Sequence, residues 1–235
     1  MKFKAALRYQ LVELLQSAVA FCVIVGAVVV AVCILTGSLW FQVPLLGVLV
    51  VILMLRLPLS LFSDDMRFLL HMGLTRAQVY ASSAVAFAVT ALLFALLEVV
   101  CSHALGPAWM GSSSFARSLY GIQSLGVLVD FAWMFGANLA AALTALALAI
   151  VRVKVGKKWF LAGLAAVAIL ALLVIPAICE ALFGNILPLA EGTAGLFGVT
   201  AAGADPTRAL FPFAVAVVLA VLAGYFVVKH VEVRA

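Results

Sequence analysis

Three acidic residues, Glu98, Asp130 and Glu180, lie at the ends of long apolar runs and are the first candidates for chemistry. Carboxylates there could form a rim that attracts a cationic substrate or accepts protons, because an ionisable group near a membrane is costly without a role or a partner. The simpler interpretation, which we favour, is that all three are solvated charges at helix ends. Arg56 lies inside an apolar run, about 9 Å from its nearer end at helical rise, so its long side chain can reach that end.

The other reactive side chains form no recognisable catalytic or metal site. His71, His103 and His230 are scattered along the chain, and we expect Ser112-Ser113-Ser114 in a loop, with no helix to present a nucleophile. Residues 152–158 contain the Gly-Lys pair of a phosphate-binding loop but lack its preceding Gly and its following Ser or Thr. We therefore predict that the chain is not an enzyme and binds no cofactor or metal. Four cysteines without CxxC spacing are expected to be packing residues: Cys22, Cys33, Cys101 and Cys179.

Polar residues 63–78 separate two of the apolar runs and contain signals for two helix ends. Ser63 or Asp64 can accept from the free N–H groups of a first helical turn. Gly73 suits the left-handed position that closes a helix, and Thr75 with Gln78 matches a capping box that starts the next helix. We predict a short amphipathic helix over residues 63–74 that offers a surface to a cytoplasmic partner.

Composition places the whole chain in a membrane. Hydrophobic residues make up 68% of the 235 residues, only 10% are charged, and the mean hydropathy is +1.32. About 20 helical residues cross the hydrocarbon core, and the uncharged runs reach that length. They predict one all-α domain over residues 1–235 with six transmembrane helices at about 17–36, 40–62, 77–102, 125–151, 159–179 and 209–228.

The distribution of Lys and Arg predicts the orientation. With the N-terminus in the cytoplasm, only Arg117 and Arg208 fall outside, which is a strong positive-inside bias. Both termini are then cytoplasmic, and the net charge of +5 is explained by topology and anionic lipid rather than nucleic acid. The inside carries eleven basic residues: Lys2, Lys4, Arg8, Arg67, Arg76, Arg152, Lys154, Lys157, Lys158, Lys229 and Arg234.

Two further segments have a predicted membrane role. Residues 1–16 have apolar side chains at helical spacing, with Lys4 and Arg8 on another face, which favours a helix lying in the headgroup region. Residues 180–208 are too rich in Gly and Pro for a long helix and too apolar for a free loop. We interpret them as a re-entrant outer segment of short helices, with an extracellular cap as the alternative. A ladder of small residues serves either packing within the subunit or a dimer interface: Ala137, Ala141, Ala145 and Ala149.

This arrangement resembles type-2 ABC exporter permeases. The shared features are six spans with both ends inside, an amphipathic N-terminal helix, a coupling helix between spans 2 and 3 and a re-entrant outer segment before span 6. Gly73, Thr75 and Arg76 match the family's G-x-S/T-R segment, and the size is similar to that of small Gram-positive permeases that export toxic peptides or antibiotics. The resemblance assigns contact with an ATPase to these residues: Asp64, Asp65, Arg67, Phe68, His71, Met72, Gly73, Thr75 and Arg76.

The resemblance also implies partners. A separate ABC ATPase subunit would bind ATP and Mg, and a second permease subunit, identical or homologous, would complete the pathway in the plasma membrane. Two other classes remain open. One is an ion- or proton-coupled carrier using Arg56, Glu98 and Asp130, and the other is a non-transporting membrane anchor or assembly partner.

Overall fold

The computed structural model describes residues 2–36, 44–104, 114–122, 125–170, 187–200 and 203–230. Nearly all of these residues are helical, because apolar runs without breaking residues satisfy their main-chain polar groups within each helix. The long helices are α1 (Lys2–Thr36), α2 (Pro44–His71), α3 (Arg76–Ala104), α6 (Val127–Val155), α7 (Lys157–Ile169) and α10 (Leu210–Lys229). The short elements are α5 (Phe115–Tyr120), α9 (Leu187–Leu196), the antiparallel pair β1 (Val199–Thr200) and β2 (Gly203–Ala204), and η2 (Pro206–Ala209).

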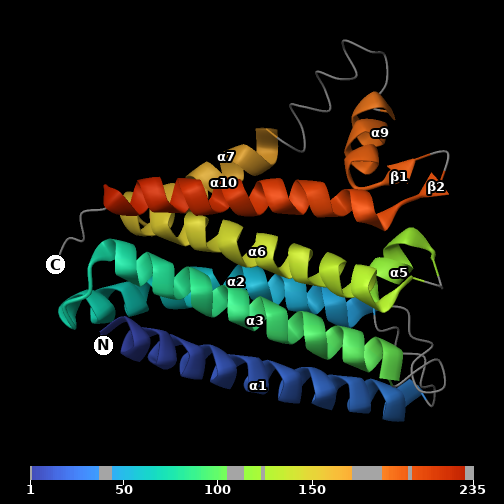
Figure 1. The fold of residues 1–235 in the computed structure, drawn as a ribbon, viewed down its shortest axis with the longest axis horizontal. Helices are drawn as coiled ribbons and strands as arrows, with labels where there is room; N and C mark the ends of the chain where they lie inside the picture. Colours follow the sequence, from blue (N-terminus) through green and yellow to red (C-terminus); the bar gives the residue numbers. More distant parts are fainter. Residues whose placement is uncertain are drawn as a thin grey trace.

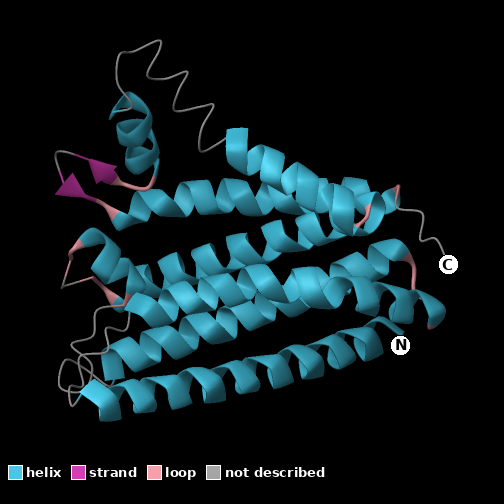
Figure 2. Cartoon of the chain, turned by 180° about the vertical axis from the view of Figure 1, so that it is seen from behind, coloured by secondary structure: helices cyan, strands magenta, loops and turns pink. Residues whose placement is uncertain are grey.

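The long helices run lengthwise beside one another, and the two ends of the bundle differ (Figure 1). One end, which we call the basic end, holds the start of α1, the α2–α3 and α6–α7 junctions and the end of α10. The opposite end, which we call the far end, holds α5, β1 and β2 (Figure 2). Ten of the eleven basic residues predicted inside are described, and they belong to the segments of the basic end.

Helix α6 forms the centre and packs against α2, α3 and α10. Its small side chains allow this close packing, because Ala137, Ala145 and Ala149 are buried while Ala141 is half-buried. A Cβ at Gly136 would lie 3.1 Å from the ring of Phe213 on α10. The buried part of the ladder therefore packs within the subunit, as one of the two alternatives had it.

Four helical segments are long and apolar enough to cross a membrane: Lys2–Val28, Arg76–His103, Val127–Val155 and Pro206–Lys229. A fifth is the bent pair Gly47–Phe62 and Asp65–His71 in α2. The described part of the predicted fifth span is α7, whose 13 residues are about 20 Å long, and residues 171–179 lie outside the described residues. The four segments, or five with the bent pair, are compatible with a multi-pass membrane protein, and a crossing by the predicted fifth span at 159–179 stays a prediction.

Two boundaries differ from those expected. The turn predicted after an interfacial helix at 1–16 is not there, because Lys2–Thr36 is one continuous helix with a single internal glycine, Gly26, and no proline. The start predicted for a separate helix at Ser63 or Asp64 falls inside α2, whose last part, Asp65–His71, is instead bent by 41° from Gly47–Phe62. Pro58 removes one helical hydrogen bond shortly before this bend, which favours bending in this part of α2.

The outer segment predicted at 180–208 is described only from Leu187. There it forms α9, a two-residue β-pair that the sequence did not predict, and η2. Glu180 lies outside the described residues, and a re-entrant path through the membrane stays a prediction.

Candidate functional site

The junction between α2 and α3, residues 72–78, is built as the sequence predicts and is called the joint below. Gly73 has a φ of +79°, in the left-handed region, and donates to the oxygen of Leu70 at 2.9 Å. Leu74 donates to the oxygen of Leu69 at 3.2 Å, so the two bonds form a Schellman motif that closes α2. Thr75 N–H donates to Gln78 Oε1 at 3.0 Å and Gln78 N–H to Thr75 Oγ1 at 3.3 Å, which confirms the capping box of α3.

The last turns of α2 have one buried and one exposed face. Met66 and Leu69 are buried, and Asp65 is 8% exposed and interacts with the rest of the chain. On the other face, Phe68 is 46% exposed, with its ring 5.1 Å from that of Tyr9, and Met72 is 59% exposed, so two large apolar side chains four residues apart are only partly covered. Among the other residues predicted to contact an ATPase, Arg67, His71, Gly73 and Thr75 are exposed and Arg76 is half-buried; the side chain of Asp64 is not described.

Hydrogen bonds tie the first turns of α3 to two other long helices. Gln10 Nε2 on α1 donates to Ser83 Oγ at 2.7 Å in a buried position. Tyr80 Oη donates to the oxygen of Val221 on α10 at 3.0 Å, and it packs so closely that a Cβ at Gly224 would lie 2.7 Å from it. A change in the angle of the joint would therefore act on α1 and α10 as well as on α3.

A second polar site lies at the far end around Asp130, which is fully buried in the first turn of α6. Its carboxylate accepts from Ser114 Oγ at 2.5 Å, lies 3.2 Å from His103 Nε2, and is 3.6 Å from Arg117 Nε. Arg117 Nη2 also contacts the His103 ring and donates to the oxygen of Leu125 at 3.2 Å. The His103 ring therefore lies between the Asp130 carboxylate and the Arg117 guanidinium, whose Nη2 is 3.0 Å from His103 Nδ1.

Ser112 and Ser113 lie outside the described residues, and the prediction of a loop without a helix is wrong for Ser114. It is the N-cap of α5, where its Oγ accepts from the N–H of Arg117 at 3.3 Å. Its hydroxyl proton points to Asp130 rather than to His103, so the three residues do not form a Ser-His-Asp relay. The arrangement holds a buried negative charge in place and does not activate a nucleophile.

Glu98 on α3 lies in the same site. Its Oε1 accepts from the N–H of Phe115 at 3.4 Å, one residue after the serine that bonds Asp130. Glu98 is 1% exposed, and its Oε2 has no hydrogen-bond partner among the described residues. A Cβ at Gly47 would lie 2.6 Å from Glu98 Oε1, so glycine is what lets α2 approach this carboxylate. We call Glu98, His103, Ser114, Arg117 and Asp130 the far-end cluster.

The expectation that the outer acids are solvated helix-end charges is therefore wrong for Glu98 and Asp130. Both are buried because α5, which the sequence did not predict, folds over them and supplies donors from its first turn. Arg56 is not part of this site. It is exposed on α2, nine residues after Gly47, and lines a shallow pocket of about 440 Å³ with Ser60 and Arg152.

An aromatic group connects α5 to the outer segment. Tyr120 Oη donates to the oxygen of Phe197 at 2.5 Å and accepts from Trp133 Nε1 at 3.2 Å, and burial raises the pKa of Tyr120 above its usual value. The Trp133 ring makes edge contacts with Phe115 and Phe213, with centroids 5.5 and 5.3 Å apart. These rings lie beside an apolar pocket of about 590 Å³ between α2, α6 and α10.

Among the described residues, no group of three or more His, Cys, Asp or Glu side chains is placed to hold a metal ion. No protein-family model matches the chain, and neither does a curated protein or a solved structure. Fold and site together place the chain in one class, that of helical proteins compatible with multiple membrane crossings.

Proposed function

We propose that the chain is the membrane-spanning permease subunit of an ATP-driven ABC exporter. The observation that carries this proposal is the joint with its exposed apolar pair, Phe68 and Met72. A chain that only reversed direction between two spans would not need a Schellman motif, a capping box and a bent helix end at the same place. A separate ABC ATPase would dock on this face, and ATP and Mg would be bound by that partner.

In the proposed mechanism, the bent end of α2 is a lever and the joint passes its movement on to α3. Movement of the docked ATPase on nucleotide binding would tilt Asp65–His71 against the rest of α2 at the existing bend. Because Ser83 is bonded to Gln10 and Tyr80 to Val221, the start of α3 would carry α1 and α10 with it. The response would be a concerted shift of several helices rather than a local change.

The substrate pathway would lie between two permease subunits, identical or homologous. The aromatic pocket beside Trp133 and Phe213 is almost wholly apolar in lining and opens between α2, α6 and α10, which suits an amphipathic or lipophilic substrate. A toxic peptide or an antibiotic is the cargo we favour. In the plasma membrane, the basic end would face the cytoplasm, together with both termini.

A photocrosslinking residue at Met72 tests this proposal. We expect it to capture a protein with a nucleotide-binding loop, whereas the same residue at Trp159 captures none. Trp159 is a matched control because it is also large, apolar, 74% exposed and close to the basic end. The captured ATPase and the chain, purified together, should show substrate-stimulated ATP hydrolysis that Phe68→Ala/Met72→Ala lowers and Trp159→Ala does not.

Hydrolysis by the purified chain alone would contradict the proposal. Equal capture from Trp159 would show that the captured protein does not recognise the joint. Unchanged stimulation in the double variant would show that Phe68 and Met72 do not transmit the signal.

The burial of Glu98 and Asp130 favours a second candidate, a proton-coupled carrier. Glu98 has one oxygen without a partner among the described residues, which leaves room for a proton to be bound there. In that case transport would need no ATPase, and adding substrate to proteoliposomes would move protons. Glu98→Gln would abolish this transport, and Glu98→Asp would retain part of it. Transport that requires ATP and tolerates Glu98→Gln would exclude this candidate.

A further inference from the structure

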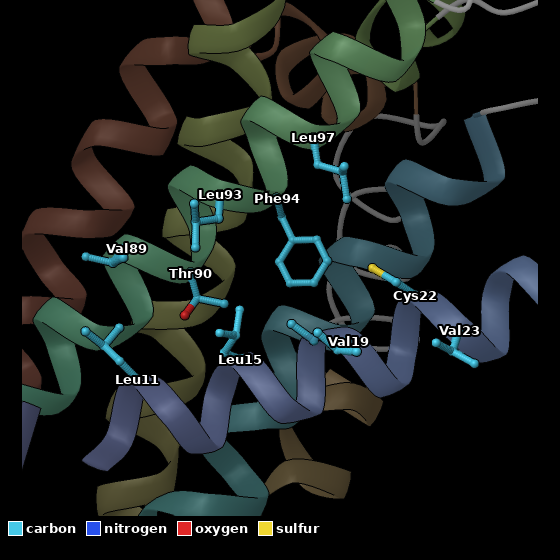
Figure 3. A pocket seen from close by; sticks show the side chains of 11 residues that line it. Leu11, Leu15, Val19, Cys22, Val23, Val89, Thr90, Leu93, Phe94 and Leu97 are labelled. Carbon is cyan, nitrogen blue, oxygen red and sulfur yellow. The ribbon is translucent and has the colours of Figure 1, made fainter. Parts of the chain in front are cut away.

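An apolar groove runs along the surface between α1 and α3 (Figure 3). It has a volume of about 660 Å³ and extends from Leu11 and Val89 at one end to Cys22 and Leu97 at the other. The groove exists because α1 lies at the edge of the bundle, where only 6% of its most apolar window is buried. Thr90 is the one hydroxyl-bearing residue in the lining, and its hydroxyl donates to the oxygen of Ala86 within α3, so it is not free to donate to a ligand.

The groove begins where α1 is fastened to α3. A buried hydrogen bond of 2.7 Å from Gln10 Nε2 to Ser83 Oγ joins the two helices. The groove lining starts at the next residue of α1, Leu11. Further along, Phe94 lines the groove, and its ring meets that of Phe21 on α1 edge to face with centroids 6.1 Å apart. From Leu11 to Cys22 the groove is about 16 Å long at helical rise, which is about half the thickness of a hydrocarbon core.

Positive charge continues the groove toward the basic end. Arg8 and Lys4 lie seven residues before Leu15 and Leu11, two turns back, and therefore share the face of α1 that lines the groove. Both basic residues are exposed. One face of α1 thus presents two cations and then an apolar channel whose length matches one leaflet.

We propose that this face of α1 binds one anionic phospholipid, with an acyl chain in the groove and the phosphate against Arg8 and Lys4. An acyl chain needs an apolar surface without unpaired polar groups, and an anionic headgroup is attracted to nearby Lys and Arg side chains. A soluble phosphate would meet the same cations, but only a lipid also fills the groove. The lipid would hold the exposed edge helix against the bundle beyond the Gln10–Ser83 bond.

Native mass spectrometry of the delipidated chain, titrated separately with phosphatidylglycerol and phosphatidylcholine, tests this proposal. Each basic residue near an anionic headgroup contributes about a fivefold gain in binding, so we expect a preference of roughly 25-fold for phosphatidylglycerol. Lys4→Gln/Arg8→Gln should reduce that preference to threefold or less. The matched control Lys157→Gln/Lys158→Gln, which removes two exposed charges from the same end of the bundle, should keep it.

A second pair of variants tests the groove itself. Val19→Trp, at a half-exposed lining position, should weaken both lipids about tenfold, whereas Val28→Trp, equally exposed but outside the groove, should change neither. Glycerol phosphate in excess should not displace the lipid. Loss of the preference in the Lys157/Lys158 control, full binding to Val19→Trp, or displacement by glycerol phosphate would each overturn the proposal.

Discussion

The joint and the far-end cluster are both polar sites in an apolar bundle, but different parts of the chain build them. In the joint, each capping bond links residues no more than five positions apart, and the side chains around it are largely exposed. In the far-end cluster, Asp130 is bonded to residues 16 and 27 positions away and is fully buried. The first site is therefore a local structure that a partner can reach, while the second is a tertiary contact that holds three segments together.

The largest difference that we expect between these two ends concerns access from outside the cell. In a background without native cysteines, Leu119→Cys on α5 should react with an impermeant maleimide in intact cells, since Leu119 is 51% exposed. Lys157→Cys at the basic end should react only after permeabilisation, because positively charged loops stay in the cytoplasm. The reverse pattern would invert the proposed orientation and would separate the joint from any cytoplasmic ATPase.

Removing the charge of Asp130 should have the largest effect on stability. Asp130→Asn would leave the nearly buried Arg117 without its counter-ion, which costs about 3 kcal/mol in sites of this kind. Glu98→Gln should change stability by less than about 1 kcal/mol, because only one of its oxygens accepts a hydrogen bond among the described residues. Thermal unfolding in detergent, followed by tryptophan fluorescence, measures both. Equal losses would show that the two carboxylates form one interdependent unit.

Two glycines allow the same backbone change to be made at each site. Gly73 in the joint and Gly121 at the end of α5 both have left-handed φ values, +79° and +66°. A valine at either position should cost about 1–2 kcal/mol of stability for the backbone conformation alone. Only Gly73→Val should also lower substrate-stimulated hydrolysis by the partner ATPase, with basal hydrolysis kept, and Arg76→Glu should act likewise. If Gly121→Val at equal membrane abundance lowered it as much, the joint would have no special role in coupling.

The same contrast explains what the sequence could predict. Uncharged runs located the ends of α3 and α10 to within two residues and those of α6 to within four, whereas α1 begins fifteen residues before its predicted span and α2 ends nine residues after its own. The agreement arises because helix formation in an apolar run depends on the run itself. The left-handed Gly73 and the capping pair Thr75–Gln78 were predictable for the same reason, since both signals lie within a stretch of six residues. The interfacial helix at 1–16 and the separate helix at 63–74 were predicted wrongly, because each required a helix break that the folded chain does not contain.

The far-end cluster could not be predicted in the same way. The burial of Glu98 and Asp130 depends on α5, six residues whose helix is set by a Ser114 cap that also bonds Asp130. The available signal was an Arg and a His close to two acids in an apolar chain, which suggests pairing but gives no geometry. Only the fold shows that Ser114 and Phe115 serve one carboxylate each.

The smallest effect that we expect is at the capping box, and it tests how local the joint is. Thr75→Ala removes the acceptor for the N–H of Gln78 and should cost about 1 kcal/mol, while Thr75→Ser should cost only a few tenths. Gln78→Ala should cost about 0.5 kcal/mol, because the N–H of Thr75 that it leaves is exposed and can bond water instead. Chemical unfolding in detergent can resolve these differences if the unfolding free energy falls with denaturant concentration at the same slope in all variants. A loss above about 2 kcal/mol for Thr75→Ala would mean that the joint, like the far-end cluster, holds distant segments together, and the distinction between a reachable local lever and a buried tertiary contact would no longer apply.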